Sequence, residues 1–238
     1  MRIDGRALEE MREVKLTTEF TKFAEGSCLI EMGNTMVLCN ASVEERVPPH
    51  VHSGGWVTAE YSMLPRANRE RSKRDISKLK LSARSAEIQR LIGRSLRSAV
   101  DLKLLEGITI TIDCDVLQGD GGTRTASVTG GFVALARACR KLLAQGKIEK
   151  MPLKSYVSGI SAGIVRNEAM LDLCYEEDSK AMVDLNCIMT AEGDIIELQG
   201  TGEGRPFTVE EQMRLVELCR KGNMLLTQIQ RRVIGELE

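Results

Sequence analysis

The stretch that decides the fold runs from Ile108 to Ala144 and begins I-T-I-T-I-D-C-D-V-L-Q-G-D-G-G-T-R-T-A-S-V-T-G-G. Residues 108–116 alternate β-branched or apolar side chains with polar ones, and this period of two predicts a strand. From about Thr125 to Leu143 the chain is rich in Ala, Val and Leu, which predicts a helix. The sequence therefore predicts a strand, a glycine-rich turn and a helix in immediate succession.

The turn itself reads Gly119, Asp120, Gly121, Gly122, Thr123 and Arg124. Glycines let the main chain approach a ligand closely, and the free N–H groups at a helix start attract anions. The guanidinium of Arg124 adds a fork that suits phosphate oxygens. An ordinary strand-to-helix turn is the alternative from local spacing alone. No Lys follows the glycines as the Walker pattern requires, which disfavours a P-loop NTPase.

Composition is that of an ordinary globular protein, but charge is unevenly distributed along the chain. The 238 residues are 42% hydrophobic and 28% charged, with a formal net charge of −1, so no overall basicity indicates nucleic acid. Residues 66–84 nevertheless hold eight Lys or Arg and two acidic residues, whereas residues 168–211 hold twelve Asp or Glu and two basic residues. This uneven distribution of charge is consistent with a polyanion bound at one place and a metal at another, or with two solvated faces.

The cysteines and the termini indicate a reducing, aqueous environment. None of the seven cysteines has C-x-x-C spacing, so we expect cytoplasmic localisation without structural zinc or a disulfide framework. Residues 1–15 are polar, with no signal-peptide pattern, and predict a solvated leader. No apolar run approaches the roughly eighteen residues of a membrane span.

The rest of the chain reads as hairpins and helices. Strands are predicted at 27–31, 35–43, 56–63, 156–165, 169–174, 182–190 and 195–199, and helices at 86–100 and from Thr208 to about Val233. Thr208 and Glu211 form a T-x-x-E capping box that marks the start of the last helix. The order predicts an α+β protein with two similar halves, which we treat as one structural unit covering residues 1–238.

Three aspartates and one arginine are candidates for binding ions. Asp172, Asp178 and Asp184 are spaced six apart, two of them inside predicted strands where a buried carboxylate is costly unless it is paired or metal-bound. Carboxylates that converge from a loop and a strand suit Mg²⁺, although surface carboxylates are the alternative. Arg84 lies at the start of a helix, where a cation opposes the helix dipole, and this placement favours an anion partner.

Longer motifs occur in a fixed order along nearly the whole chain. They are F-T-K-F-A-E-G-S, G-W-V-T-A-E-Y-S-M-L-P, A-E-I-Q-R-L-I-G-R-S-L-R, D-C-D-V-L-Q-G-D-G-G-T-R-T-A-S-V-T-G, C-Y-E-E-D-S-K-A-M-V-D-L-N and I-I-E-L-Q-G-T-G-E-G-R-P-F-T-V-E-E. With these motifs the chain resembles the ribonuclease PH family of phosphorolytic exoribonucleases, and is less similar to that family's relatives in the archaeal exosome ring.

The resemblance implies a fold, an activity and an assembly. The fold is the ribosomal protein S5 domain 2-like fold, and the assembly is a hexameric ring built as a trimer of dimers. The activity is reversible, phosphate-dependent trimming of RNA 3′ ends, chiefly those of tRNA precursors, with release of nucleoside diphosphates. Mg²⁺ is the implied cofactor and inorganic phosphate the co-substrate.

The resemblance also implies roles for residues at matching positions. Phosphate binding falls to Arg84, Gly122, Thr123 and Arg124. Asp178 and Asp184 match the positions of the metal ligands and the catalytic carboxylates, and either could be the general acid. Arg124 is also implied to be catalytic. RNA binding falls to Arg66, Arg69, Arg71 and Arg74. The loop at residues 50–55 departs from the family because it lacks a K-G-Q-G-Q-G run.

Two other functions are compatible with parts of this pattern. A non-catalytic RNA-binding ring subunit of an exosome-like assembly would keep the fold and lose the chemistry. A hydrolytic nuclease would use the same metal with water as the nucleophile. The arginines and both aspartates occur together in this chain, which favours the phosphorolytic enzyme.

Overall fold

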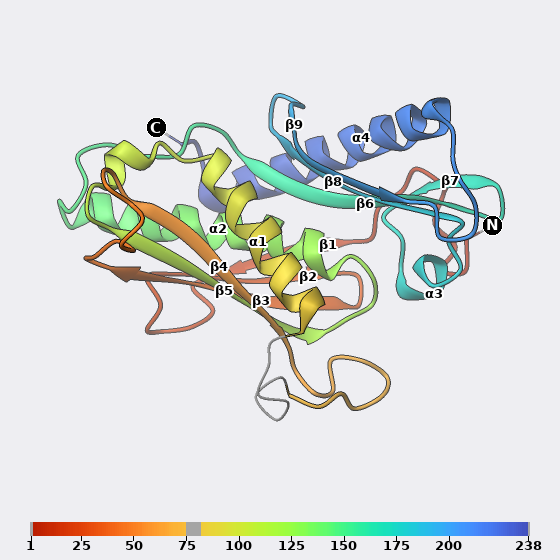
Figure 1. Cartoon of the computed structure of the whole chain (residues 1–238), viewed down its shortest axis with the longest axis horizontal. Coiled ribbons are helices and arrows are strands. Elements are labelled where there is room, and N and C mark those ends of the chain that lie inside the picture. The colour runs from red at the N-terminus through yellow and green to blue at the C-terminus, as the bar shows by residue number, and fades with distance from the viewer. Residues whose placement is uncertain (1, 75–81, 238) are drawn as a thin grey trace.

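Two β-sheets, with helices between and beside them, make up the structure (Figure 1). It is a computed structural model and describes residues 2–74 and 82–237. The first sheet has five strands in the order β1-β2-β3-β5-β4, and the second has four in the order β7-β6-β8-β9. The predicted strands and helices are confirmed to within a few residues at their ends.

The first sheet combines an antiparallel meander with one parallel pair. Its strands are β1 (Val14–Thr18), β2 (Gly26–Met32), β3 (Thr35–Glu44), β4 (Trp56–Met63) and β5 (Thr109–Gln118). Strands β4 and β5 run parallel, and helix α1 (Ala83–Ser98) lies in the connection between them. A short 3-10 helix, Leu102–Leu105, leads into β5. The alternation along β5 places Ile110, Ile112 and Cys114 in the core.

Helix α2 (Thr123–Ala144) lies between the two sheets. It is buried along most of its length because it packs on β2 and β3 on one side and on β6 on the other. Its approach to β2 is so close that a Cβ on Gly26 would lie 1.9 Å from the carbonyl oxygen of Ala134. The N-terminus of this central helix therefore opens where the two halves of the protein meet.

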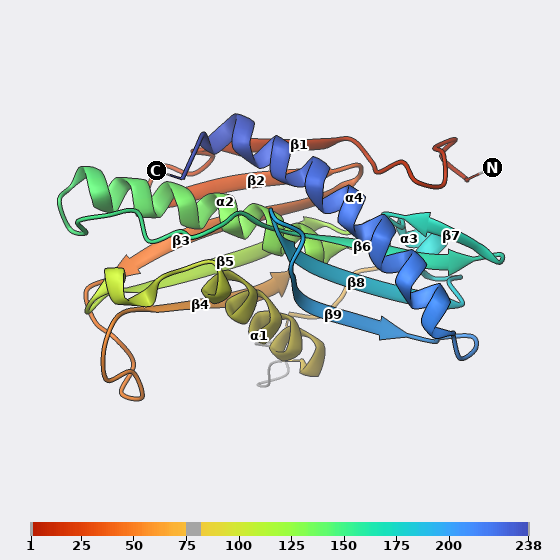
Figure 2. The ribbon, with the colours of Figure 1, turned by 90° about the horizontal axis from the view of Figure 1, so that it is seen from above.

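The second half repeats the pattern of a sheet followed by a long helix. Its strands are β6 (Val157–Val165), β7 (Glu168–Leu171), β8 (Val183–Thr190) and β9 (Ile195–Thr201), with the short helix α3 (Tyr175–Asp178) between β7 and β8. Helix α4 (Val209–Ile234) crosses this sheet diagonally (Figure 2). Both arms of the predicted capping box at its start are present, between Thr208 and Glu211.

Strand β6 packs against both α2 and α4. A Cβ on Gly159 would contact Thr125 of α2, whereas the next residue, Ile160, lies against Gly222 of α4. Accordingly, the hydrophobic cluster that is built on the first sheet also contains Val157 of β6. The treatment of residues 1–238 as one unit stays a prediction.

The predicted solvated leader at residues 1–15 is wrong for its arginines, although most of the other described side chains of the segment are exposed. Arg2 and Arg12 are only 4% and 6% exposed, and the segment ends in strand β1, which the sequence did not predict. The arginines are buried because carboxylates of the second half, far away in sequence, neutralise them. In the described parts of the chain, none of the helices combines the length and apolarity needed to cross a bilayer.

Candidate active site

The glycine turn before α2 adopts a conformation that requires glycine. Gly121 and Gly122 have φ of 79° and 67°, in the left-handed region that side chains disfavour. A Cβ on Gly121 would also lie 2.5 Å from the carbonyl oxygen of Leu173. Gly122 caps α2 without a side-chain hydrogen bond, so no capping side chain occupies the N–H groups of the first turn. The turn therefore presents these donors at the positive end of the helix dipole.

Thr123 and Arg124 occupy the first turn of α2. The Thr123 hydroxyl forms a 2.9 Å hydrogen bond with the hydroxyl of Tyr61 in β4. Arg124 Nη1 donates to Gln199 Oε1 in β9 at 2.8 Å and lies 3.7 Å from Glu87 Oε1 in α1. These contacts hold the guanidinium at the junction of the two sheets.

Arg84 lies in the first turn of α1 and faces the same group of residues as Arg124. Burial raises the pKa of Asp178, and the charges of Arg84 and Arg124 oppose that rise. Burial likewise raises the pKa of Tyr61, again opposed by the same two arginines. Both guanidinium groups thus lie close enough to Asp178 and Tyr61 to act on them electrostatically, and the structure brings the two predicted phosphate-binding arginines together.

The two aspartates face this positive charge from the second half. Asp178 ends α3, and Asp184 is the second residue of β8. Burial, reinforced by the charge of Asp178, raises the pKa of Asp184 to about 6. Asp184 Oδ2 accepts a 3.0 Å hydrogen bond from Asn186, whereas its Oδ1 is buried without a hydrogen-bond partner. An unsatisfied carboxylate oxygen beside a second carboxylate is an unfavourable arrangement unless a proton or a cation joins it.

This arrangement can hold a hydrated cation between the aspartates. Across residues 2–74 and 82–237, no group of three or more His, Cys, Asp or Glu side chains forms a metal-binding cluster. Two carboxylates nevertheless fit Mg²⁺, which binds one or two carboxylates and takes its other ligands from water and phosphate oxygens. Asp172, the third aspartate of the sequence pattern, does not join them because it is ion-paired with Arg12.

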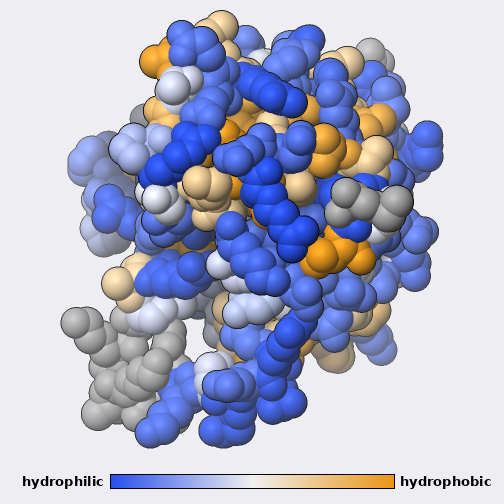
Figure 3. Space-filling model, turned by 90° about the vertical axis from the view of Figure 1, so that its right-hand side faces the viewer, coloured by the Kyte–Doolittle hydropathy of each residue, from blue (hydrophilic) through white to orange (hydrophobic). Residues whose placement is uncertain are grey.

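The predicted RNA-binding arginines lie beside the site on the segment that follows β4. Arg66, Arg69, Arg71 and Arg74 are all exposed, and residues 75–81 of the basic run lie outside the described residues. Arg69 donates to Glu176 Oε1 at 2.8 Å and lies over the ring of Tyr175, so the segment contacts α3 next to Asp178. Polar and charged side chains cover most of this end of the molecule (Figure 3).

An open cavity of about 750 Å³ adjoins the turn, bordered by Arg66, Arg69 and Asp120. Neither Arg84, Arg124 nor the two aspartates line this cavity. The cluster of Arg84, Arg124, Asp178 and Asp184 is therefore separate from this cavity, although both adjoin the turn before α2.

Several residues of the site were missed by the sequence analysis. Asn186 shares a face of β8 with Asp184, and its period of two was a signal that could have found it. Tyr61, Glu87 and Gln199 carry no local signal because their role depends on the packing of β4, α1 and β9 around the turn.

The fold and the site together define an enzyme that acts at a phosphate group, with positive charge on one half of the protein and carboxylates on the other. Comparison with known proteins makes the assignment specific. Residues 10–141 match the profile of the 3′ exoribonuclease family, domain 1, and residues 155–222 match domain 2 of the same family. The chain belongs to the 3′ exoribonuclease family.

Individual relatives agree with this assignment. The chain is 51% identical over 239 residues to the Ribonuclease PH of Moorella thermoacetica. The aligned region covers 100% of this chain and 96% of the relative. Among solved structures, rice (Oryza sativa) Rrp46 matches with a TM-score of 0.80 at 17% identity, covering 98% of this chain and 100% of that one. The Archaeoglobus fulgidus exosome with RNA bound to the active site matches with a TM-score of 0.80 at 22% identity, covering 95% and 91%.

These findings confirm the resemblance and the expected S5 domain 2-like fold of two β-α halves. They also confirm the expected activity, that of a phosphorolytic 3′→5′ exoribonuclease, with RNA as substrate. The non-catalytic ring subunit is not favoured.

Proposed function

We propose that the chain trims the 3′ ends of tRNA precursors, with inorganic phosphate attacking the last phosphodiester bond. A phosphate oxygen forms a bond to the terminal phosphorus, and the bond from that phosphorus to the preceding 3′ oxygen breaks. The products are a nucleoside diphosphate and an RNA that is one nucleotide shorter. Because a phosphodiester is exchanged for a phosphoanhydride, the reaction is reversible and its direction depends on the phosphate concentration.

The observation that carries the proposal is that Arg124, in the first turn of α2, and Arg84, in the first turn of α1, both act electrostatically on Asp178, which lies beside Asp184. Two anionic groups must approach one another, so the site has to supply positive charge. The backbone N–H groups after Gly122, the Thr123 hydroxyl and the guanidinium groups of Arg84 and Arg124 would hold the attacking phosphate.

Asp178 and Asp184 would hold the cofactor Mg²⁺ through the unpaired Oδ1 of Asp184 and a carboxylate oxygen of Asp178. When bound, the ion neutralises charge on the phosphoryl oxygens. The departing 3′ oxygen needs a proton, and one carboxyl group with a raised pKa can donate it while the other holds the ion. Since the two aspartates interact, they titrate as a pair, and either can be the donor.

The exposed arginines that follow β4 would hold the RNA backbone. Arg66, Arg71 and Arg74 extend from the segment that Arg69 attaches to α3, next to Asp178. Contacts to phosphates carry little base preference, which suits an enzyme that removes successive nucleotides of any sequence.

We further propose a hexameric ring and cytoplasmic localisation. The ring, a trimer of dimers, is supported by the archaeal exosome core, which matches with a TM-score of 0.74 over 99% of this chain. Reduced cysteines support the cytoplasm, since all seven are buried and free.

Incubation of an end-labelled RNA with Mg²⁺, with and without phosphate, tests the activity. Phosphorolysis gives nucleoside diphosphates only when phosphate is present. Nucleoside monophosphates formed regardless of phosphate would indicate hydrolysis, and intact RNA would indicate a binding subunit. Sizing of the protein in solution tests the ring separately.

A further inference from the structure

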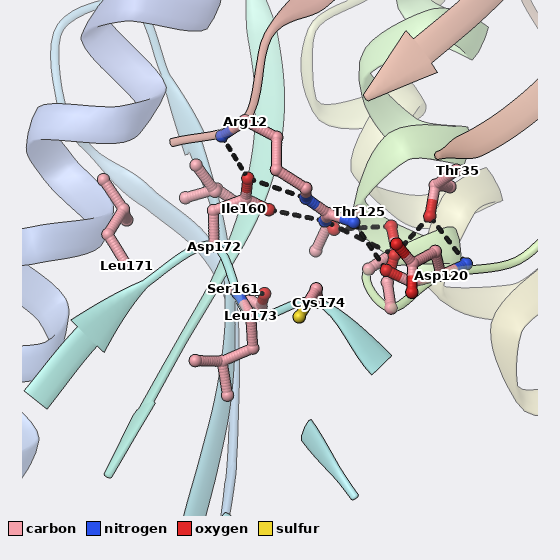
Figure 4. Close-up of polar contacts among 12 residues, drawn as sticks. Arg12, Thr35, Asp120, Thr125, Ile160, Ser161, Leu171, Asp172, Leu173 and Cys174 are labelled. Atoms are coloured by element: carbon pink, nitrogen blue, oxygen red, sulfur yellow. Dashed lines mark hydrogen bonds and ion pairs between the residues drawn. The ribbon is translucent and has the colours of Figure 1, made fainter. Parts of the chain in front are cut away.

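Arg12 lies in the interior of the protein and connects two elements of the site (Figure 4). Its backbone N–H and its Nε donate to Asp172 Oδ2 at 2.7 and 2.9 Å, and Nη2 donates to Oδ1 at 2.6 Å. The same guanidinium donates through Nη1 to the carbonyl oxygen of Asp120 at 2.5 Å. Its Nη2 also lies 3.5 Å from the carbonyl oxygen of Gly121. One side chain thus binds both the glycine turn and a carboxylate of the second half.

The glycine turn has further polar anchors at the start of β3 and at the start of α3. Thr35 in β3 donates to the Gly121 carbonyl at 2.7 Å and accepts from the N–H of Asp120 at 2.9 Å. The Asp120 carboxylate accepts from Asn34 at 3.2 Å and from the N–H of Tyr175, the first residue of α3, at 3.3 Å. Hydrogen bonds to Asn34, Thr35 and Tyr175 therefore hold the turn in addition to those from Arg12.

Asp172 leads directly into the element that carries the catalytic aspartate. It is fully buried, and its φ of 53° is unusual for a residue with a side chain. The residues that follow it contact the back of Gly121 and begin α3, which ends at Asp178. Glu177 of the same helix is fixed by Arg2, which donates to both of its carboxylate oxygens.

We infer that Arg12, paired with Asp172, is a positioning residue that sets the separation between the phosphate-binding turn and Asp178. The inference rests on the proposed function of that turn. Arg12 forms no hydrogen bond with Arg84, Arg124 or Asp178; it holds the turn through the carbonyl groups of Asp120 and Gly121, and its charge also acts on Asp178 electrostatically. An arginine suits the position because its planar fork serves both oxygens of one carboxylate and two carbonyls at once.

A purely structural role is the competing explanation. A buried ion pair is weak evidence for stability, since removal of water from both charges costs about as much as their attraction gains. A positioning role and a structural role predict different effects when the turn is slightly loosened. Misplacement of a binding group by about 1 Å can lower a rate about 100-fold, whereas a stabilising pair alone changes only the folding equilibrium.

Two variants test the inference, Arg12→Lys and Asp172→Asn. Lys keeps the charge but has one donor nitrogen in place of the three with which the Arg12 side chain spans Asp172 and the turn, and Asn keeps the shape and tolerates a left-handed backbone. We expect the KM for phosphate to rise about 10-fold to 100-fold while the KM for RNA is unchanged. Calorimetric titration of the protein with inorganic phosphate should show the same loss without turnover. The double variant should have no higher KM for phosphate than the worse single variant, because either change alone breaks the connection between the turn and Asp172.

The matched control is Leu226→Ala, which removes a fully buried side chain of α4 in the core of the second half. It should lower the melting temperature at least as much as the other variants and leave the KM for phosphate unchanged. Should Arg12→Lys fail to fold, Asp172→Asn gives the same comparison. Variants that melt earlier but bind phosphate like the wild type would overturn the positioning role. A wild type that binds no phosphate would instead contradict the proposed function.

Discussion

Replacement of Asp184 by Asn should inactivate the protein and at the same time make it more stable. Asp184 is half-buried beside Asp178, and its buried Oδ1 has no hydrogen-bond partner. Burial and the neighbouring negative charge raise its pKa from 3.8 to about 6. The folded protein therefore holds the carboxyl proton to a higher pH than the unfolded chain does, and ionisation of this carboxyl lowers the free energy of unfolding.

The size of the effect follows from the shift in the pKa of Asp184. Each pKa unit corresponds to about 1.4 kcal/mol, so the rise from 3.8 to about 6 corresponds to at most about 3 kcal/mol. This stability is present below the unfolded pKa and is lost as the pH rises through about 6. Asn has the same shape and never ionises, so above that pH Asp184→Asn should unfold at a higher temperature, by at most roughly 6–12 °C for a chain of this size.

Thermal or urea denaturation in EDTA and without phosphate, at several pH values between about 4 and 8, measures this difference. The advantage of Asp184→Asn should grow as the pH rises to about 6 and stay constant above about pH 7. The exposed Asp194→Asn serves as the control and should change the free energy of unfolding by less than about 0.5 kcal/mol. An Asp184→Asn variant no more stable than the wild type at about pH 8 would refute the reasoning.

Three further predictions concern the turn and the basic segment. Arg124→Ala should abolish phosphorolysis and leave RNA binding largely intact, whereas the same change at Arg137, farther along α2, should leave both phosphorolysis and RNA binding intact; turnover and gel-shift assays measure the two. Gly121→Ala should destabilise the protein by about 1–3 kcal/mol, because its Cβ would meet the Leu173 carbonyl at 2.5 Å. Gly107→Ala has a similar φ of 72° but open space around it, and equal losses of stability in the two variants would exclude the contact as the cause. Arg71→Ala should reduce the slope of RNA affinity against salt by about one, and an unchanged slope would count against an RNA contact there.

The sequence was informative wherever the signal was local. The alternation of 108–116, the glycines after it and the capping box at Thr208 predicted β5, the turn and α4, because each depends on backbone geometry a few residues long. The chain-long motifs added the site residues Arg84 and Asp184, which local spacing alone left ambiguous.

The sequence was uninformative where a residue depends on a distant partner. Arg2 and Arg12 read as solvated, yet each is neutralised by a carboxylate more than 150 residues away in the chain. Gln199 is a similar case, because its amide oxygen accepts a hydrogen bond from Arg124 in the folded protein, where β9 packs beside α1. Such contacts arise from the packing of the two halves, which no local pattern records.

The central claim is that phosphate, bound on the turn before α2, is the attacking group. The most direct measurement uses radiolabelled inorganic phosphate with unlabelled RNA and Mg²⁺, followed by separation of the nucleotides released. The account predicts that the label appears in nucleoside diphosphates and that Arg124→Ala prevents this. Unlabelled nucleoside monophosphates formed at the same rate without phosphate would contradict it.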